Sequence, residues 1–308
     1  MALTLQRPPR MLPMYARAAV SALPGASLIP FLGATSTLEE ETLRLPDIRA
    51  DPVRLAAYRE ICGFKPGKHL PITYLHILAF PLHMKLLTSP GQPFSAVGLV
   101  HIENRILTDR PIDQREPLTL QVRLAAPEPH PRGEVFRLLT EASVAGERVW
   151  RSASTMLHRH ASTKEPGRDS SSGRARPRVV QRERSLAAPW QLPRTLGRRY
   201  AAISGDRNPI HTHPLAARAL GFSGVIAHGM WSKARVLAAL EAELPAACAV
   251  HVRFRKPIVL PATIQLARPN PQNGGRFTVR DAARHTLHLE GRILQIGHPS
   301  AELTEEET

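Results

Sequence analysis

Two almost wholly apolar stretches, one in each half of the 308-residue chain, limit the folds that this sequence can adopt. Residues 72–88 are predicted to form a helix that is apolar on nearly every face and kinked at Pro81. Residues 227–244 have the same character and are ended by Pro245. Neither stretch reaches the roughly 18 to 20 continuous apolar residues that span a bilayer. We therefore expect no membrane span, and we expect both helices to be buried inside the protein.

Runs with strand character follow each apolar stretch and are separated by Pro and Gly turns. They lie at residues 97–107, 118–125, 135–144 and 149–157, and again at 250–259, 262–267, 277–281 and 286–296. Antiparallel strands that follow a buried helix are its natural cover. The sequence thus predicts an α+β fold of two units, each an antiparallel sheet wrapped around a central helix.

A short internal match supports a duplication. Residues 100–105 and 250–255 both read Val-His-(Ile or Val)-x-x-Arg, and each follows an apolar helix. Two such units can pair side by side as a pseudo-dimer within one chain. Whether two pseudo-dimers form a homodimer stays open.

The expected organisation has five parts. We assign an extended N-terminal arm to residues 1–38, a first unit to 39–160, a basic Ser/Gly-rich linker to 161–183, a second unit to 184–300, and an acidic tail to 301–308. Prolines at 13, 24 and 30 argue against a targeting segment in the arm. The two cysteines, Cys62 and Cys248, cannot build a disulfide framework, which favours a reducing compartment and predicts a cytoplasmic location.

The formal net charge of +15 raises the question of nucleic acid. Arginines cluster in and beside the linker, but no aromatic residues are interleaved to stack on bases. A solvated basic loop is the simpler interpretation, so no nucleic-acid partner is predicted.

The segment that carries chemistry begins at Tyr200 and ends at His211. Asn208 precedes Pro209 and is biased away from helical backbone, so the chain should turn sharply and bring Asp206 near His211. A carboxylate and an imidazole on a rigid turn can hold one water molecule as an acid/base pair. Thr212 or His213 can then cap a short helix that starts at Pro214.

A second chemical feature opens the apolar helix of the second half. Its first N–H groups have no partner within the helix, and Gly229 has no side chain to keep a carbonyl away. The backbone there is suited to stabilising a developing oxyanion.

Taken together, residues 200–211, Gly221-Phe222 and residues 226–230 closely resemble the signature of the MaoC-like (R)-specific enoyl-CoA hydratases. The duplicated layout, with the motif in the second half only, resembles the double hot-dog members, which include (3R)-hydroxyacyl-thioester dehydratases. The resemblance implies a double hot-dog fold and a carbon-oxygen lyase that interconverts (3R)-3-hydroxyacyl thioesters and trans-2-enoyl thioesters plus water. It also implies no metal or redox cofactor, with the acyl group carried on coenzyme A or acyl carrier protein.

The resemblance assigns residue roles as well. Asp206 and His211 would be catalytic, Asn208 would support them, and the Gly229 N–H would contact the thioester oxygen. Substrate contacts are expected from Tyr200, Ser204 and His228, and from Leu78 and Met84 in a degenerate first half that shapes the acyl tunnel. Leu237 stands where some single hot-dog members have a Ser that orients the catalytic Asp, so that orientation must come from elsewhere.

Other interpretations remain open at this point. A hot-dog acyl thioesterase, a non-catalytic acyl-thioester-binding protein and a basic nucleic-acid-binding protein would each use part of this pattern. His211, His213 and His228 could ligate a metal, but the motif already accounts for His211 and His228, and no metal is expected. Four further histidines are expected to be satisfied polar groups beside the core: His76, His83, His101 and His251.

Overall fold

The computed structural model describes residues 2–21, 42–89, 92, 96–159, 186–268 and 274–297. The elements of the first half, in chain order, are β1 (Ala2–Thr4), α1 (Met11–Ser21), β2 (Thr42–Ile48), α2 (Pro52–Cys62), α3 (Tyr74–Leu87), β3 (Val100–Thr108), β4 (Leu118–Leu124), β5 (Glu128–His130), β6 (Gly133–Val144) and β7 (Glu147–Arg159). Those of the second half are β8 (Trp190–Leu192), α4 (Leu196–Ser204), α5 (Pro209–Thr212), α6 (Pro214–Ala219), α7 (Gly229–Ala239), the 3-10 turn η2 (Glu241–Glu243), β9 (Cys248–Phe254), β10 (Ala262–Ala267), β11 (Arg276–Asp281) and β12 (Leu287–Gln295).

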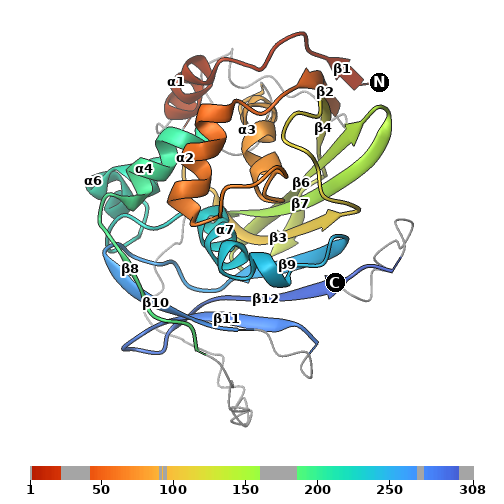
Figure 1. The fold of residues 1–308 in the computed structure, drawn as a ribbon. Helices are drawn as coiled ribbons and strands as arrows, with labels where there is room; N and C mark the ends of the chain where they lie inside the picture. Colours follow the sequence, from red (N-terminus) through yellow and green to blue (C-terminus); the bar gives the residue numbers. More distant parts are fainter. Residues whose placement is uncertain are drawn as a thin grey trace.

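The strands form one continuous curved sheet of twelve strands. Its order is β1-β2-β4-β6-β7-β3-β9-β12-β11-β10-β8, with β5 added beside β6. The first five-stranded part, from β2 to β3, belongs to the first half, and the part from β9 to β8 belongs to the second. Figure 1 shows α3 and α7 on the inner side of the curved sheet, with α2 beside them. The predicted arrangement of two sheets, each wrapped around one helix, is confirmed.

The two halves meet where β3 pairs with β9, and these strands contain the two matched segments of the sequence. The pairing is antiparallel, and it places Glu103 opposite Arg253, its own counterpart in the match. The Glu103 carboxylate lies 3.0 Å from Nε2 of His251 and 3.1 Å from Nε of Arg253. Burial would raise the pKa of Glu103, but the hydrogen bond from His251 and the nearby arginines lower it to about 2. We call this pairing of β3 with β9 the seam. The two halves are related there by a local pseudo-two-fold axis.

The central helices differ in detail from the predicted ones. Helix α3 runs through Pro81 and is held by Trp150, whose Nε1 donates to the Ile72 carbonyl at 2.9 Å. Helix α7 begins at Gly229 and ends at Ala239, before the 3-10 turn, so the predicted range of 227–244 was too long. None of the helices in the described ranges has the length and apolarity needed to cross a bilayer.

Several predicted boundaries need correction or cannot be compared. The N-terminal arm is not extended throughout, because residues 11–21 form α1. Strand β9 ends at Phe254 and not at residue 259, since Pro257 has no N–H for the ladder. The linker at 161–183 and the tail at 301–308 lie outside the described residues, and the division into parts stays a prediction.

A buried lysine ties the seam to the central helix of the second half. Lys233 in α7 has no exposed surface, and its Nζ donates to Oδ1 of Asn104 at 2.6 Å and to the Val250 carbonyl at 2.9 Å. Nδ2 of Asn104 in turn donates to Oγ of Ser152 and of Ser154, at 3.0 Å each. Burial lowers the pKa of Lys233 well below its usual value. The network joins α7, β3, β7 and β9 through buried polar groups.

We expect Asn104→Leu to lower the free energy of unfolding by about 3 kcal/mol, because it leaves the buried amine of Lys233 without its closest acceptor. Lys233→Met should cost less, since it removes the amine itself and keeps the volume of the side chain. Urea unfolding of both variants measures the difference. A larger loss for Lys233→Met than for Asn104→Leu would contradict this account of the seam.

Candidate active site

The turn after α4 holds the acidic residue of the site. Helix α4 ends at Ser204 and is followed by Gly205, whose φ of +83° is the left-handed conformation that glycine adopts without strain. The Asp206 N–H then donates to Oγ of Ser204 at 3.1 Å, and Oδ1 of Asp206 accepts from the Asn208 N–H at 3.1 Å. The Asn208 side chain caps α5 by accepting from the Ile210 N–H at 3.3 Å. These hydrogen bonds between residues close in sequence fix the orientation of Asp206. A Ser at position 237 is not needed for it, and Leu237 is fully buried there.

His211 is the basic partner, and its environment defines its protonation. Nδ1 lies 2.8 Å from the Ile226 carbonyl, which can only accept, so Nδ1 carries the proton and Nε2 has the free lone pair. Burial lowers the pKa of His211 below its usual value. The ring is therefore neutral at neutral pH and able to accept a proton at Nε2.

His228 supports the same turn from the start of α7. Its ring stacks on that of His211, with centroids 3.7 Å apart, and its Nε2 donates to the Asp206 carbonyl at 3.0 Å. Burial and the neighbouring His211 lower the pKa of His228 well below its usual value. These contacts let His228 position Asp206 and His211. His228 also lines the cavity described below, and its expected contact with substrate stays a prediction.

The start of α7 offers a backbone donor. His228 precedes the helix without a side-chain cap, and the described residues provide no acceptor for the Gly229 N–H. A Cβ at Gly229 would lie 3.1 Å from the Phe254 ring, tighter than most such contacts. Glycine is thus favoured here by Phe254 as well as by the approach of a substrate.

The first half supports the turn of residues 205–208 through two residues that were not predicted from the sequence, Tyr15 and Arg54. Tyr15 of α1 donates from its hydroxyl to the Gly205 carbonyl at 2.5 Å and accepts from the Arg207 N–H at 2.7 Å. Arg54 of α2 donates to the carbonyls of Ile203 and Ser204 at 2.7 and 3.1 Å. All four bonds go to the main chain, so no sequence motif marks them.

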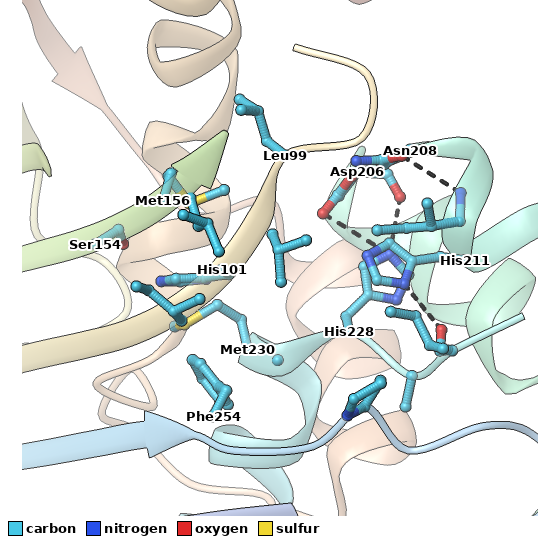
Figure 2. A pocket seen from close by; sticks show the side chains of 18 of the residues that line it. Leu99, His101, Ser154, Met156, Asp206, Asn208, His211, His228, Met230 and Phe254 are labelled. Atoms are coloured by element: carbon cyan, nitrogen blue, oxygen red, sulfur yellow. Dashed lines mark hydrogen bonds and ion pairs between the residues drawn. The ribbon is translucent and has the colours of Figure 1, made fainter. Parts of the chain in front are cut away.

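A cavity of about 160 Å³ lies between the halves and is lined by Asp206, His211 and Gly229 together with residues of α3 and β3. Figure 2 shows Asp206, Asn208, His211 and His228 on one side of it, and Leu99, His101, Ser154 and Met156 on the other. Tyr200, Ser204 and Met84 also line the cavity, as predicted for substrate contacts, although Ser204 already accepts the Asp206 N–H. Leu78 does not line it and lies in the hydrophobic core instead.

His213 is the N-cap of α6, one of the two caps that were expected, and accepts from the Ala216 N–H at 3.4 Å. It does not join His211 and His228. Three other histidines are placed differently from what was expected: His76, His83 and His101 line the cavity and do not lie at the edge of the core. His83 has a polar partner, Oγ1 of Thr140, at 2.8 Å, and His101 bonds to the Glu103 main chain.

Asp206, His211 and His228 are the described residues that could hold a metal ion, because one ligand atom of each lies within 4.8 Å of the others. Nδ1 of His211 and Nε2 of His228 are, however, engaged by backbone carbonyls. The spacing also suits a single water molecule bridging the Asp206 carboxylate and the His211 ring by two ordinary hydrogen bonds. Acid/base chemistry on that water, beside a free backbone N–H, is what the geometry allows.

Comparison with known proteins agrees with this architecture. The MaoC-like domain family matches residues 176–289. The chain is 38% identical over 271 residues to 3-hydroxyacyl-thioester dehydratase X of Mycobacterium tuberculosis, covering 87% of this chain and 94% of that protein. The crystal structure of HtdX from M. tuberculosis superposes with a TM-score of 0.73 at 35% identity, covering 83% of this chain and all (100%) of the other.

The fold class follows from a more distant structure. A conserved hypothetical protein of M. tuberculosis, described as having a double hotdog fold, matches with a TM-score of 0.54 at 13% identity over 86% of this chain and 97% of its own. The curled sheet and the two buried helices define a double hot-dog protein. The chain belongs to the MaoC-like dehydratase family.

The buried histidines make the fold sensitive to acid. Burial lowers the pKa of His76 to about 4, and it also lowers the pKa values of His83, His211 and His228. The unfolded chain binds protons at these rings below about pH 6.5 while the folded protein does not. The contribution of these rings to the free energy of unfolding should therefore be constant above pH 6.5 and fall toward pH 4, by about 1.4 kcal/mol per pH unit for each ring that stays neutral.

Chemical denaturation at pH 7.5, 6.5 and 5.5 measures this slope. His83→Gln keeps a hydrogen-bonding group near Thr140 and removes one titrating ring, so it should flatten the slope. An unfolding free energy that does not change between pH 6.5 and 5.5 would contradict the assignment of neutral buried rings.

Proposed function

We propose that this protein is an (R)-specific hydratase/dehydratase that interconverts (3R)-3-hydroxyacyl thioesters and trans-2-enoyl thioesters plus water. One observation carries the proposal: Asp206 and His211 present ligand atoms within 4.8 Å of each other, in a cavity that also includes the Gly229 backbone at the start of a buried helix. Addition of water to a carbon beta to a thioester needs these two features together, an acid/base pair for water and a donor for the thioester oxygen.

In the hydration direction, Asp206 and His211 bind one water molecule. Its oxygen bonds to C3 while one of its protons passes to the pair, and the C2=C3 π electrons move toward the thioester oxygen. The Gly229 N–H stabilises the resulting enolate-like oxygen. The electrons then return, and the pair delivers a proton to C2 on the same face. The product gains the elements of one water molecule.

A neutral His211 fits this scheme, because its Nε2 lone pair can accept the water proton and return a proton later. Asn208 and His228 keep the pair in place through the backbone of the turn. The scheme requires no metal or redox cofactor. The net charge of +15 suits coenzyme A and acyl carrier protein alike, since one carries phosphates and the other is acidic. A cytoplasmic location belongs to the same proposal, and the association of two pseudo-dimers into a homodimer stays open.

We expect Asp206→Asn and His211→Ala, made separately, to lower kcat/KM for hydration of crotonyl-CoA or a longer enoyl-CoA by about 10² to 10⁴. Loss of absorbance of the conjugated thioester measures the rate, and circular dichroism checks the fold of each variant. Near-full activity of both folded variants would contradict the assignment. A (3S) product would reject the stereochemistry, and release of free thiol in place of hydration would favour a thioesterase.

Tyr15→Phe tests the hydrogen bonds by which Tyr15 supports the turn that carries Asp206. It removes both hydrogen bonds to the catalytic turn and keeps the ring that lines the cavity. We expect kcat to fall about tenfold with little change in KM, because a turn that moves misplaces Asp206. Steady-state kinetics on one enoyl-CoA distinguish this outcome from a packing effect, which would lower the melting temperature and leave kcat unchanged.

A further inference from the structure

The wall of the cavity opposite the catalytic turn carries three imidazoles. His76 and His83 lie on α3 and His101 lies on β3, so all three belong to the half that lacks the Asp-x-Asn-x-x-His motif. The His76 ring is 5.0 Å from that of His83 and 6.1 Å from that of His101. All three line the same cavity as Asp206 and Gly229. The chemistry proposed above does not use them.

These imidazoles lie close to the reacting centre. The Phe254 ring is 3.1 Å from where a Cβ on Gly229 would be, and the His101 ring is 5.1 Å from that of Phe254. Figure 2 shows His101 across the cavity from His211 and His228, beside Ser154 and Met156. Leu99 and Met156 line the cavity on the same side as His101, so an acyl chain bound against these apolar residues and α3 passes beside the imidazoles. The rest of the α3 face is apolar, with Ile77, Phe80 and Met84, as an acyl chain requires.

Much of the hydrogen-bonding capacity of this wall is unused within the described residues. A neutral imidazole has one donor and one acceptor, and burial lowers the pKa of His76 to about 4 and that of His101 to about 3. Within the described ranges His76 has no hydrogen-bond or ion-pair partner. The His101 ring bonds to the Glu103 main chain, and its Nε2 is buried without a partner. Oγ of Ser154 accepts from Asn104, which leaves its own proton to donate.

A saturated alkyl chain would displace water from these groups and leave them unpaired, which weakens its binding. A chain with an uncharged oxygen at this depth would pair with them instead. A carboxylate is disfavoured, because the Asp206 carboxylate lines the same cavity and would repel it. Sites built to hydrogen-bond a substrate discriminate strongly against the analogue that lacks the group.

We infer that this wall is a specificity site for oxygenated acyl chains: His76 and His101, with Ser154, bind a hydroxyl or keto oxygen on the substrate's acyl chain beyond C3. The inference rests on the proposed hydratase activity and deepens it by naming the substrate class. The preferred substrate is then a thioester with a second oxygen function further along the chain than the one that the enzyme adds or removes.

The test compares trans-2-octenoyl-CoA with its 5-, 6-, 7- and 8-hydroxy counterparts on the full-length protein. We expect kcat/KM for at least one hydroxy isomer to exceed that for octenoyl-CoA by about tenfold or more. Hydration of octenoyl-CoA without preference for any hydroxy isomer would overturn the inference and leave the proposed function intact. No hydration of any of the five substrates would overturn both.

Variants assign the preference to the imidazoles. His76→Phe and His101→Phe should reduce the ratio of the two kcat/KM values to about one, since Phe keeps a ring and removes both hydrogen-bonding groups. His76→Gln and His101→Gln, which retain a donor and an acceptor, should keep part of the ratio and also serve if the Phe variants fail to fold. Lys85→Gln, on the same helix α3 but outside the cavity lining, is the control and should keep the full ratio. A ratio that survives in folded Phe variants would overturn the assignment to these residues.

Discussion

The pairing of β3 with β9 is the contact on which the rest of the structure depends. It joins two sheets into one and brings the helix of each half to the same inner surface, so that a cavity can form between α3 and the start of α7. Backbone hydrogen bonds alone would permit a shifted register. Two sets of polar contacts specify one register. Glu103 is paired with His251 and Arg253, and Lys233 is bonded to Asn104 and Val250. A shift of register would leave these charged or polar groups unpaired.

The two halves share a fold but contribute different things to the site. The second half supplies the acid/base turn and the backbone donor at Gly229. The first half lacks the turn, yet it fixes it from outside through Tyr15 and Arg54 and supplies the opposite wall of the cavity. A homodimer of identical halves would carry two equal sites. Fusion of the halves in one chain allows one of them to lose its chemistry and take on support and recognition.

Contacts between residues close in sequence could be predicted, and contacts between residues far apart in sequence could not. Asp206 and His211 are five positions apart on one turn, so local backbone rules brought them together correctly. Tyr15 and Arg54 reach the same turn from far along the chain and bond only to its main chain, which leaves no trace in the sequence. Helix α3 is apolar all round, so its pattern did not show which face borders the cavity, and Leu78 was chosen wrongly beside Met84. Its two histidines, His76 and His83, lie on that face and were the signal that was passed over.

The same histidines link the acid sensitivity of the fold to the chemistry of its cavity. An imidazole that is buried and neutral costs stability as soon as the unfolded chain can protonate it, and an apolar side chain at the same position would remove that cost. At His211 and His228 the cost is tied to the turn that handles water. At His76 and His101 no catalytic step explains it, so a purely apolar acyl chain would be served better by an apolar wall. Polar groups retained against such a cost, in a cavity otherwise lined by Ile77, Phe80 and Met84, indicate that what binds there is itself partly polar.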